Sequence, residues 1–121
     1  MSYRVLICDD SALARKMTKR SLPDNFADSV AQASNGEEAV SLLSQQQFDL
    51  LLLDLTMPIL DGVGVLEQLK QKEIDIFTIV ISGDIQPEMQ SRVKQFGVVD
   101  FIPKPICAEK LTQTLKLYGF F

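Results

Sequence analysis

Apolar runs of strand length alternate with helix-patterned segments along the whole chain, and this alternation constrains the fold more than any other feature. The runs cover residues 3–8, 30–33, 50–53, 77–81 and 98–102. Each run is followed by a segment whose apolar side chains recur at helical spacing. Strands and helices that alternate in this way form a parallel sheet with right-handed crossovers. We therefore expect an α/β fold, with a doubly wound five-stranded parallel sheet flanked by five helices.

Capping and turn residues indicate where helices begin and where the last strand ends. Ser11 is a predicted N-cap, and Asn35 is another, with Glu38 three residues later able to reach back toward it. Pro87 stands at a first-turn position, which suits proline because no N–H is needed there. Pro103 cannot donate a hydrogen bond to a sheet ladder. We expect the last strand to lie at a sheet edge or to end at this proline.

Length and charge limit the kinds of partner. The 121 residues suffice for one domain, which we place at residues 1–121. Twelve basic against sixteen acidic residues give a net charge of −4, which repels phosphate backbones and anionic lipid. The richest apolar stretch, residues 50–55, is interrupted by Asp54 far short of a membrane span, and residues 1–4 lack the charged-then-apolar order of a signal peptide. We expect a cytoplasmic protein that contacts neither nucleic acid nor membrane directly.

Histidine and cysteine usage restricts the possible chemistry. The sequence contains no histidine, which removes the commonest general base and excludes Ser-His-Asp and Cys-His mechanisms. The two cysteines, Cys8 and Cys107, lie far apart in the sequence and form no CxxC pair. We therefore expect neither a disulfide framework nor a zinc cluster, and we interpret both cysteines as buried free thiols.

Three carboxylates directly follow two of the predicted strands. Asp9 and Asp10 come after the first strand, and Asp54 comes after the third. In a doubly wound order these strands are neighbours, so their carboxyl ends bring the three acids to one crevice. Like charges packed together favour binding of a cation, and oxygen ligands without His or Cys favour Mg²⁺ over Ca²⁺ or zinc. The alternative for Asp9 and Asp10 alone is the ordinary preference of acids for a helix N-terminus.

Two more strand ends contribute polar side chains. Ser82 follows the fourth strand and offers a hydroxyl, while Lys104 follows the fifth and offers a mobile ammonium. Together they could hold a dianionic group at Asp54. Taken separately, Ser82 is more often a helix or turn cap, and Lys104 is more often a solvated surface lysine. Their coincidence at one sheet edge favours the functional interpretation.

Short motifs occur in a fixed order along the chain. They are Asp9-Asp10, Ala33-Ser34-Asn35-Gly36-Glu37-Glu38-Ala39, Leu53-Asp54-Leu55-Thr56-Met57-Pro58-Ile59-Leu60-Asp61-Gly62, Ser82-Gly83-Asp84 and Phe101-Ile102-Pro103-Lys104-Pro105. This ordered set resembles the receiver domain of two-component response regulators, of the chemotaxis-regulator type, over essentially all of the chain. The resemblance implies a flavodoxin-like sheet with strand order 2-1-3-4-5.

The resemblance also implies a phosphoryl-transfer role for the acidic crevice. Asp54 is implied to accept a phosphoryl group from a histidine kinase or a histidine phosphotransfer protein. Asp10, Asp54 and the main-chain carbonyl of Thr56 are implied to hold Mg²⁺, with Asp9 acting mostly through a metal-bound water. In-line attack by a carboxylate on an activated phosphoryl group chiefly needs positioning and charge neutralisation.

Further roles follow from the same resemblance. Ser82 and Lys104 are implied to bind the phosphoryl oxygens, and the Lys104–Pro105 peptide bond is implied to be cis. Phe101 is implied to be an aromatic switch that turns inward when Ser82 moves.

The implied output of the switch is a surface made by the fourth helix, the fifth strand and the fifth helix, around Arg92, Phe101 and Lys110. Its partner is a downstream protein or a missing C-terminal output domain, and the chain is expected to be a monomer or a phosphorylation-dependent dimer. The resemblance also places Thr56 and Asp84 at the two positions that, in the family, tune how quickly the acyl phosphate hydrolyses.

Two other functional classes remain open at this point. One is a slow aspartate-dependent phosphatase that acts on exogenous substrates, although Thr56 stands where haloacid dehalogenase-type phosphatases place a second aspartate as general acid. The other is a constitutive binding module whose acids only hold metal or face solvent.

Overall fold

A computed structural model describes residues 3–83 and 86–121 of the chain. The strands are β1 (Tyr3–Cys8), β2 (Ala27–Ala33), β3 (Leu50–Leu53), β4 (Phe77–Ser82) and β5 (Asp100–Pro103). The helices are α1 (Ala12–Ser21), α2 (Gly36–Gln45), α3 (Gly62–Gln71), α4 (Pro87–Gln95) and α5 (Ala108–Leu117). The strands are parallel and ordered β2-β1-β3-β4-β5, which confirms the predicted flavodoxin-like α/β fold.

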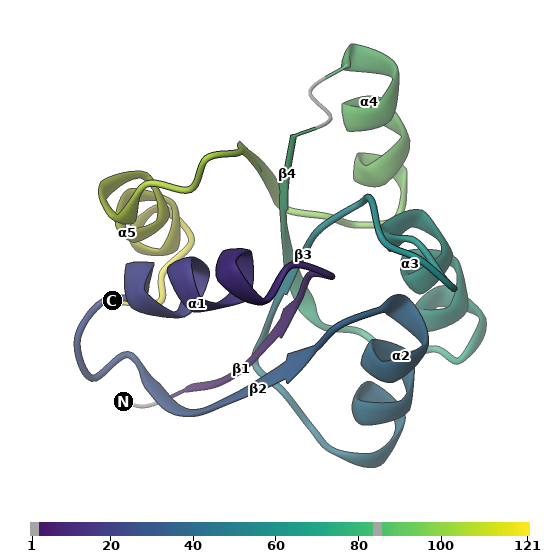
Figure 1. Ribbon diagram of the computed structural model, residues 1–121, viewed down its shortest axis with the longest axis horizontal. Coiled ribbons are helices and arrows are strands. Elements are labelled where there is room, and N and C mark those ends of the chain that lie inside the picture. Colours follow the sequence, from purple (N-terminus) through teal and green to yellow (C-terminus); the bar gives the residue numbers. More distant parts are fainter. Residues whose placement is uncertain (1–2, 84–85) are drawn as a thin grey trace.

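The helices form two layers, one on each face of the sheet. Helices α1 and α5 lie on one face, and α2, α3 and α4 lie on the other (Figure 1). None of the helices within the described ranges is long and apolar enough to cross a bilayer.

The core is divided between the two faces of the sheet. Along β3, Leu51 and Leu53 pack into the cluster beneath α2, α3 and α4, whereas Leu50 and Leu52 pack into the cluster beneath α5. All four leucines are 1% exposed or less, and burial of each side chain contributes about 2 kcal/mol to folding. The all-leucine run is therefore a central strand covered on both faces, and Asp54 follows it at the sheet's carboxyl edge.

The two outer strands differ in extent from the sequence prediction. Strand β2 begins at Ala27 rather than at Val30, because pairing with β1 recruits residues of weak intrinsic strand preference. Strand β5 begins at Asp100 rather than at Val98 and ends at Pro103, at the edge of the sheet, as expected for a proline.

Side-chain caps fix the starts of the helices that flank the sheet's carboxyl edge. The Ser11 hydroxyl accepts a hydrogen bond from the Ala14 N–H, and the Asn35 side chain accepts one from the Glu38 N–H, so both predicted caps are confirmed. Glu38 does reach back, but its carboxylate accepts hydrogen bonds from the N–H and hydroxyl of Ser34. The capping interaction is thus displaced by one residue from Asn35.

The two cysteines have different environments, so the prediction of two buried thiols is wrong for Cys107. Cys8 is buried at the end of β1, whereas Cys107 is exposed at the position that precedes α5. A residue at a helix entrance on the surface has little apolar neighbourhood to bury it. Burial first, and then the nearby charges of Asp9 and Asp54, raise the pKa of the Cys8 thiol to about 12.

Candidate functional site

The ends of β1 and β3 bring the predicted acids together. Cys8 and Leu53 are register partners, and the Asp54 N–H donates a 2.9 Å hydrogen bond to the Cys8 carbonyl. The residues that follow, Asp9 and Asp54, therefore lie side by side at the carboxyl edge of the sheet. One carboxylate oxygen from each of Asp9, Asp10 and Asp54 lies within 4.8 Å of the others.

Lys104 reaches the same place from the loop after β5. Its Nζ lies 2.7 Å from Oδ2 of Asp9 and 3.6 Å from Oδ1 of Asp54. The Lys104 N–H donates a 2.9 Å hydrogen bond to the Ser82 carbonyl, and the Lys104–Pro105 peptide bond is cis, the geometry that the resemblance implies. The lysine is thus tied to the end of β4 and directed at the two buried carboxylates.

Burial and like charge act together on Asp54. Burial raises the pKa of its carboxyl group most, and the neighbouring charge of Asp9 raises it further. The ammonium of Lys104 and hydrogen bonds from the main-chain N–H groups of Thr56 and Leu55 oppose this rise without cancelling it. Asp54 is therefore a carboxylate held in an environment that favours added positive charge.

For the ammonium of Lys104, burial and the nearby charges shift the pKa in opposite directions. Burial lowers its pKa, but the hydrogen bond to Asp9 and the charge of Asp54 outweigh burial, so its pKa lies above the usual value. Lys104 consequently carries a full positive charge at neutral pH and provides permanent neutralisation for two carboxylates that are 4% and 5% exposed.

The donor atoms fit a hard divalent cation. The three clustered acids offer oxygen only, and the sequence has no histidine to add a nitrogen ligand. Asp9 and Asp54 are buried while Asp10 is exposed, so the cluster opens to solvent on the Asp10 side. Such an oxygen-only set suits Mg²⁺ rather than a structural zinc ion.

The remaining predicted site residues fall around this cluster. Ser82 is fully buried at the end of β4, whose Val80 is the register partner of Leu53, so Ser82 lies at the same edge as Asp54. Phe101 is half-buried on β5 and packs against the core cluster on the α2–α4 face. Asp84 lies outside the described residues.

Sequence reasoning missed Arg15, which acts on the loop that carries two of the acids. Its Nη1 donates a 2.8 Å hydrogen bond to the Asp9 carbonyl, and its Nε donates a 3.0 Å bond to the Gln32 side chain. The available signal was an arginine at the start of a helix, where the helix dipole disfavours a cation unless a specific contact holds it.

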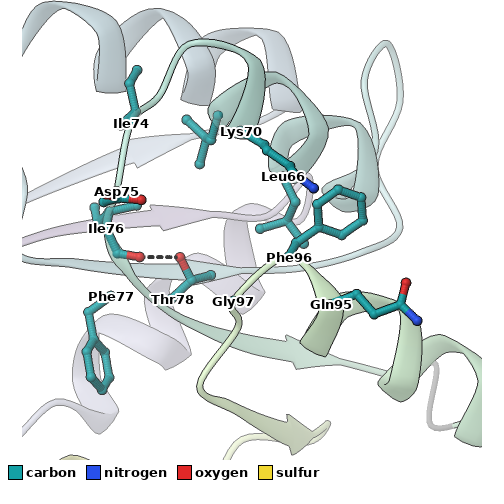
Figure 2. A pocket seen from close by; sticks show the side chains of 11 residues that line it. Leu66, Lys70, Ile74, Asp75, Ile76, Phe77, Thr78, Gln95, Phe96 and Gly97 are labelled. Atoms are coloured by element: carbon teal, nitrogen blue, oxygen red, sulfur yellow. Dashed lines mark hydrogen bonds between the residues drawn. The ribbon is translucent and has the colours of Figure 1, made fainter.

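Another hollow in the surface lies away from the acids. This pocket has a volume of about 400 Å³ and lies at the amino-terminal ends of β4 and β5 (Figure 2). The acids, in contrast, follow the carboxyl ends of β1 and β3. The Lys70 ammonium lies 5.8 Å from the ring centroid of Phe96 on its rim. None of the pocket's lining residues belongs to the acidic cluster, so it plays no part in that site.

Comparison with known proteins assigns the family. Residues 5–116 match the response regulator receiver domain. The chain belongs to this receiver family. Receiver domains are the phosphoacceptors of two-component signalling, so this domain is a signalling switch rather than a conventional enzyme, and its acidic cluster is consistent with a phosphorylation site that binds Mg²⁺.

Individual relatives support the assignment. The receiver domain is 36% identical to the chemotaxis protein CheY of Bacillus subtilis (strain 168) over 115 residues. This aligned region covers 95% of this chain and 96% of CheY. It is 32% identical to the probable C4-dicarboxylate response regulator DctR of the same organism over 117 residues. This aligned region covers 96% of this chain but only 52% of DctR. Among solved structures, the REC domain of AraT from Geobacillus stearothermophilus has a TM-score of 0.85 at 31% identity, covering 97% of this chain and 92% of that one.

Proposed function

We propose that Asp54 is the residue that accepts the phosphoryl group, delivered by a histidine kinase or a histidine phosphotransfer protein. Asp54 is buried at the end of the central strand β3, beside a cation and a second carboxylate. The donor's histidine is supplied by the partner, because the chain itself has none. The structure thus supports a nucleophile that is shielded from bulk water yet reachable from the sheet edge.

Asp10, Asp54 and the main-chain carbonyl of Thr56 are proposed to hold Mg²⁺, with Asp9 acting through water. When bound, Mg²⁺ supplies positive charge that offsets the phosphoryl oxygens. The protein's own contribution is orientation: the N–H groups of Thr56 and Leu55 and the ammonium of Lys104 fix the Asp54 carboxylate. The carboxylate is therefore positioned before the donor arrives.

Lys104 and Ser82 are proposed to hold the phosphoryl oxygens after transfer. Lys104 already lies 3.6 Å from Asp54, and its main-chain N–H is bonded to the Ser82 carbonyl, so the two residues move as a linked pair. A phosphoryl group adds between one and two negative charges to the crevice, which draws the lysine ammonium away from Asp9.

The proposed output follows from the pairing of β4 and β5. Ser82 pairs with Pro103, and Val80 pairs with Phe101, so a shift at the end of β4 is transmitted to Phe101 across the strand pair. The proposed switch surface comprises α4, β5 and α5 around Arg92, Phe101 and Lys110. Its target is a downstream protein or an output domain, with phosphorylation-dependent dimerisation as one form of response, and Thr56 and Asp84 are proposed to tune the phosphoryl lifetime.

The observation that carries the proposal is the convergence of Lys104, Asp9 and Asp54 from separate strand ends within hydrogen-bonding and ion-pairing distance. The test is incubation with acetyl phosphate and Mg²⁺, followed by intact mass measurement. We expect a gain of one phosphoryl group that requires Mg²⁺ and is absent in Asp54→Asn. Asp28→Asn, which changes an exposed carboxylate on β2, is the matched control and retains phosphorylation. Phosphorylation of Asp54→Asn at the wild-type rate would contradict the assignment.

A further inference from the structure

Arg15 joins the acidic loop to the edge strand of the sheet. Its guanidinium donates one hydrogen bond to the main-chain carbonyl of Asp9 at 2.8 Å and a second to the side chain of Gln32 on β2 at 3.0 Å. The two bonds leave from different nitrogens of one planar group, so each bond restricts the direction of the other. A helix residue thereby clamps the loop between β1 and α1 against β2.

The clamped carbonyl belongs to the peptide unit that links Asp9 to Asp10. Asp9 is held at its other groups as well: its N–H donates to the Ala33 carbonyl, and its carboxylate accepts from the Ser11 N–H and the Lys104 ammonium. The Asp10 side chain is exposed, and within residues 3–83 and 86–121 it forms no side-chain hydrogen bond or ion pair comparable to those of Asp9. The orientation of the Asp9–Asp10 peptide is therefore the constraint that aims the Asp10 carboxylate toward Asp54.

We propose that Arg15 is a positioning residue for Mg²⁺ binding, which sets metal affinity by fixing the peptide between Asp9 and Asp10. This inference rests on the proposed function, in which Asp10 and Asp54 hold the ion. Some groups do not contact the metal but orient its ligands through hydrogen bonds, and their removal commonly weakens metal binding by 10- to 100-fold. Because Arg15 acts on the main chain rather than on a ligand atom, we expect a loss at the lower end, about 10-fold.

The opposite expectation comes from charge alone. A guanidinium bonded to the main chain of the acidic loop repels a cation that binds there, so removal of its charge strengthens Mg²⁺ binding. Arg15→Lys separates the two effects, because it keeps the charge but cannot form the same pair of directed hydrogen bonds. Under the positioning role Arg15→Lys and Arg15→Gln both weaken binding, whereas under charge alone Arg15→Lys matches wild type and Arg15→Gln binds more tightly.

The experiment is a Mg²⁺ titration by calorimetry on the whole chain, for wild type, Arg15→Lys, Arg15→Gln and the control Lys16→Gln. Lys16 is the exposed neighbour on the same helix, so its variant removes a charge without touching the clamp. We expect both Arg15 variants to bind about 10-fold more weakly. Lys16→Gln binds as tightly as wild type or slightly more tightly. Arg15→Lys with wild-type affinity would overturn the inference.

Two further measurements separate positioning from a general loss of structure. With acetyl phosphate as donor, the Mg²⁺ concentration at half-maximal rate rises in Arg15→Lys, while the rate at saturating Mg²⁺ stays near that of wild type. Gln32→Ala keeps the bond to Asp9 but removes the bond at the other end of the guanidinium, so it weakens Mg²⁺ binding less than Arg15→Lys does. If the Arg15 variants do not fold, Gln32→Ala decides the question, since unchanged affinity there contradicts the clamp.

The outcomes also distinguish the inference from the proposed function. Wild-type protein that binds no Mg²⁺ overturns the proposed metal site and the inference with it. Wild-type protein that binds Mg²⁺ while Arg15→Lys binds it equally well overturns the inference alone.

Discussion

Lys104 is bonded more closely to Asp9 than to Asp54, at 2.7 Å against 3.6 Å. The contact joins residues 95 positions apart in the sequence, and both carboxylates are buried. In this arrangement the Lys104 ammonium is the main positive charge that neutralises the two buried carboxylates. In the unphosphorylated site both carboxylates therefore share one ammonium, which belongs to the residue that we propose to bind the phosphoryl group.

Replacement of Lys104 tests how much its charge stabilises the two buried carboxylates. Lys104→Met leaves two buried carboxylates without their cation, and we expect a loss of about 2 kcal/mol in the free energy of unfolding at neutral pH in the presence of a chelator. Excess Mg²⁺ binds the native state only and recovers most of this loss. Urea denaturation with and without Mg²⁺ measures both effects. A variant as stable as wild type in chelator contradicts the account.

The raised pKa of Asp54 determines the direction in which the stability of the fold changes with pH. A native carboxyl group with a raised pKa holds its proton more tightly than the unfolded chain does, so stability falls as pH rises through that range. Asp54→Asn removes this penalty, and we expect it to be more stable than wild type at neutral pH without Mg²⁺. Thermal denaturation across pH should show the gain shrinking toward acid, and the control Asp28→Asn should show no such trend.

Close approach of α3 to Asp54 requires the glycine at the helix start. A Cβ on Gly62 would lie 2.5 Å from the Asp54 carbonyl oxygen and 2.7 Å from the Leu55 Cα, both main-chain atoms that cannot move aside. We expect Gly62→Ala to cost about 1 to 3 kcal/mol and to slow phosphorylation by displacing the Asp54 main chain.

Gly64→Ala is the matched control on the same helix, because its Cβ meets chiefly the flexible side chain of Leu60. Chemical denaturation and acetyl phosphate labelling of both variants make the comparison. Equal effects of the two substitutions would refute the close-approach argument.

The two cysteines are expected to react differently. Burial raises the pKa of Cys8 to about 12, so its thiolate is scarce at pH 8, whereas Cys107 is exposed. A thiol-specific reagent should modify one cysteine per native chain, at position 107, and both after denaturation. Cys107→Ser should abolish the native reaction, while rapid native labelling of Cys8 would show that the end of β1 opens to solvent.

Sequence patterns located the strands' carboxyl edge and the acids on it because parallel topology leaves little freedom there. Asp9, Asp10 and Asp54 follow adjacent strands, so their convergence is a property of the fold. The N-caps Ser11 and Asn35 were equally readable, since a cap depends on residues three positions away at most.

Features that depend on long-range side-chain geometry were not predictable in this way. The preference of Lys104 for Asp9 depends on where a flexible side chain ends, and the Arg15 clamp depends on the spacing between α1 and β2. The exposure of Cys107 depends on what covers the entrance to α5. The extension of β2 to Ala27 arises from its pairing with β1 rather than from its own composition.

Locating the modified residue tests the central claim most directly. Protein phosphorylated with acetyl phosphate and Mg²⁺ is reduced with borohydride, which converts an aspartyl phosphate to homoserine, and is then mapped by peptide mass spectrometry. The account predicts homoserine at position 54, dependent on Mg²⁺ and strongly reduced in Lys104→Met. Homoserine at another aspartate, or at position 54 in equal yield without Mg²⁺, would contradict it.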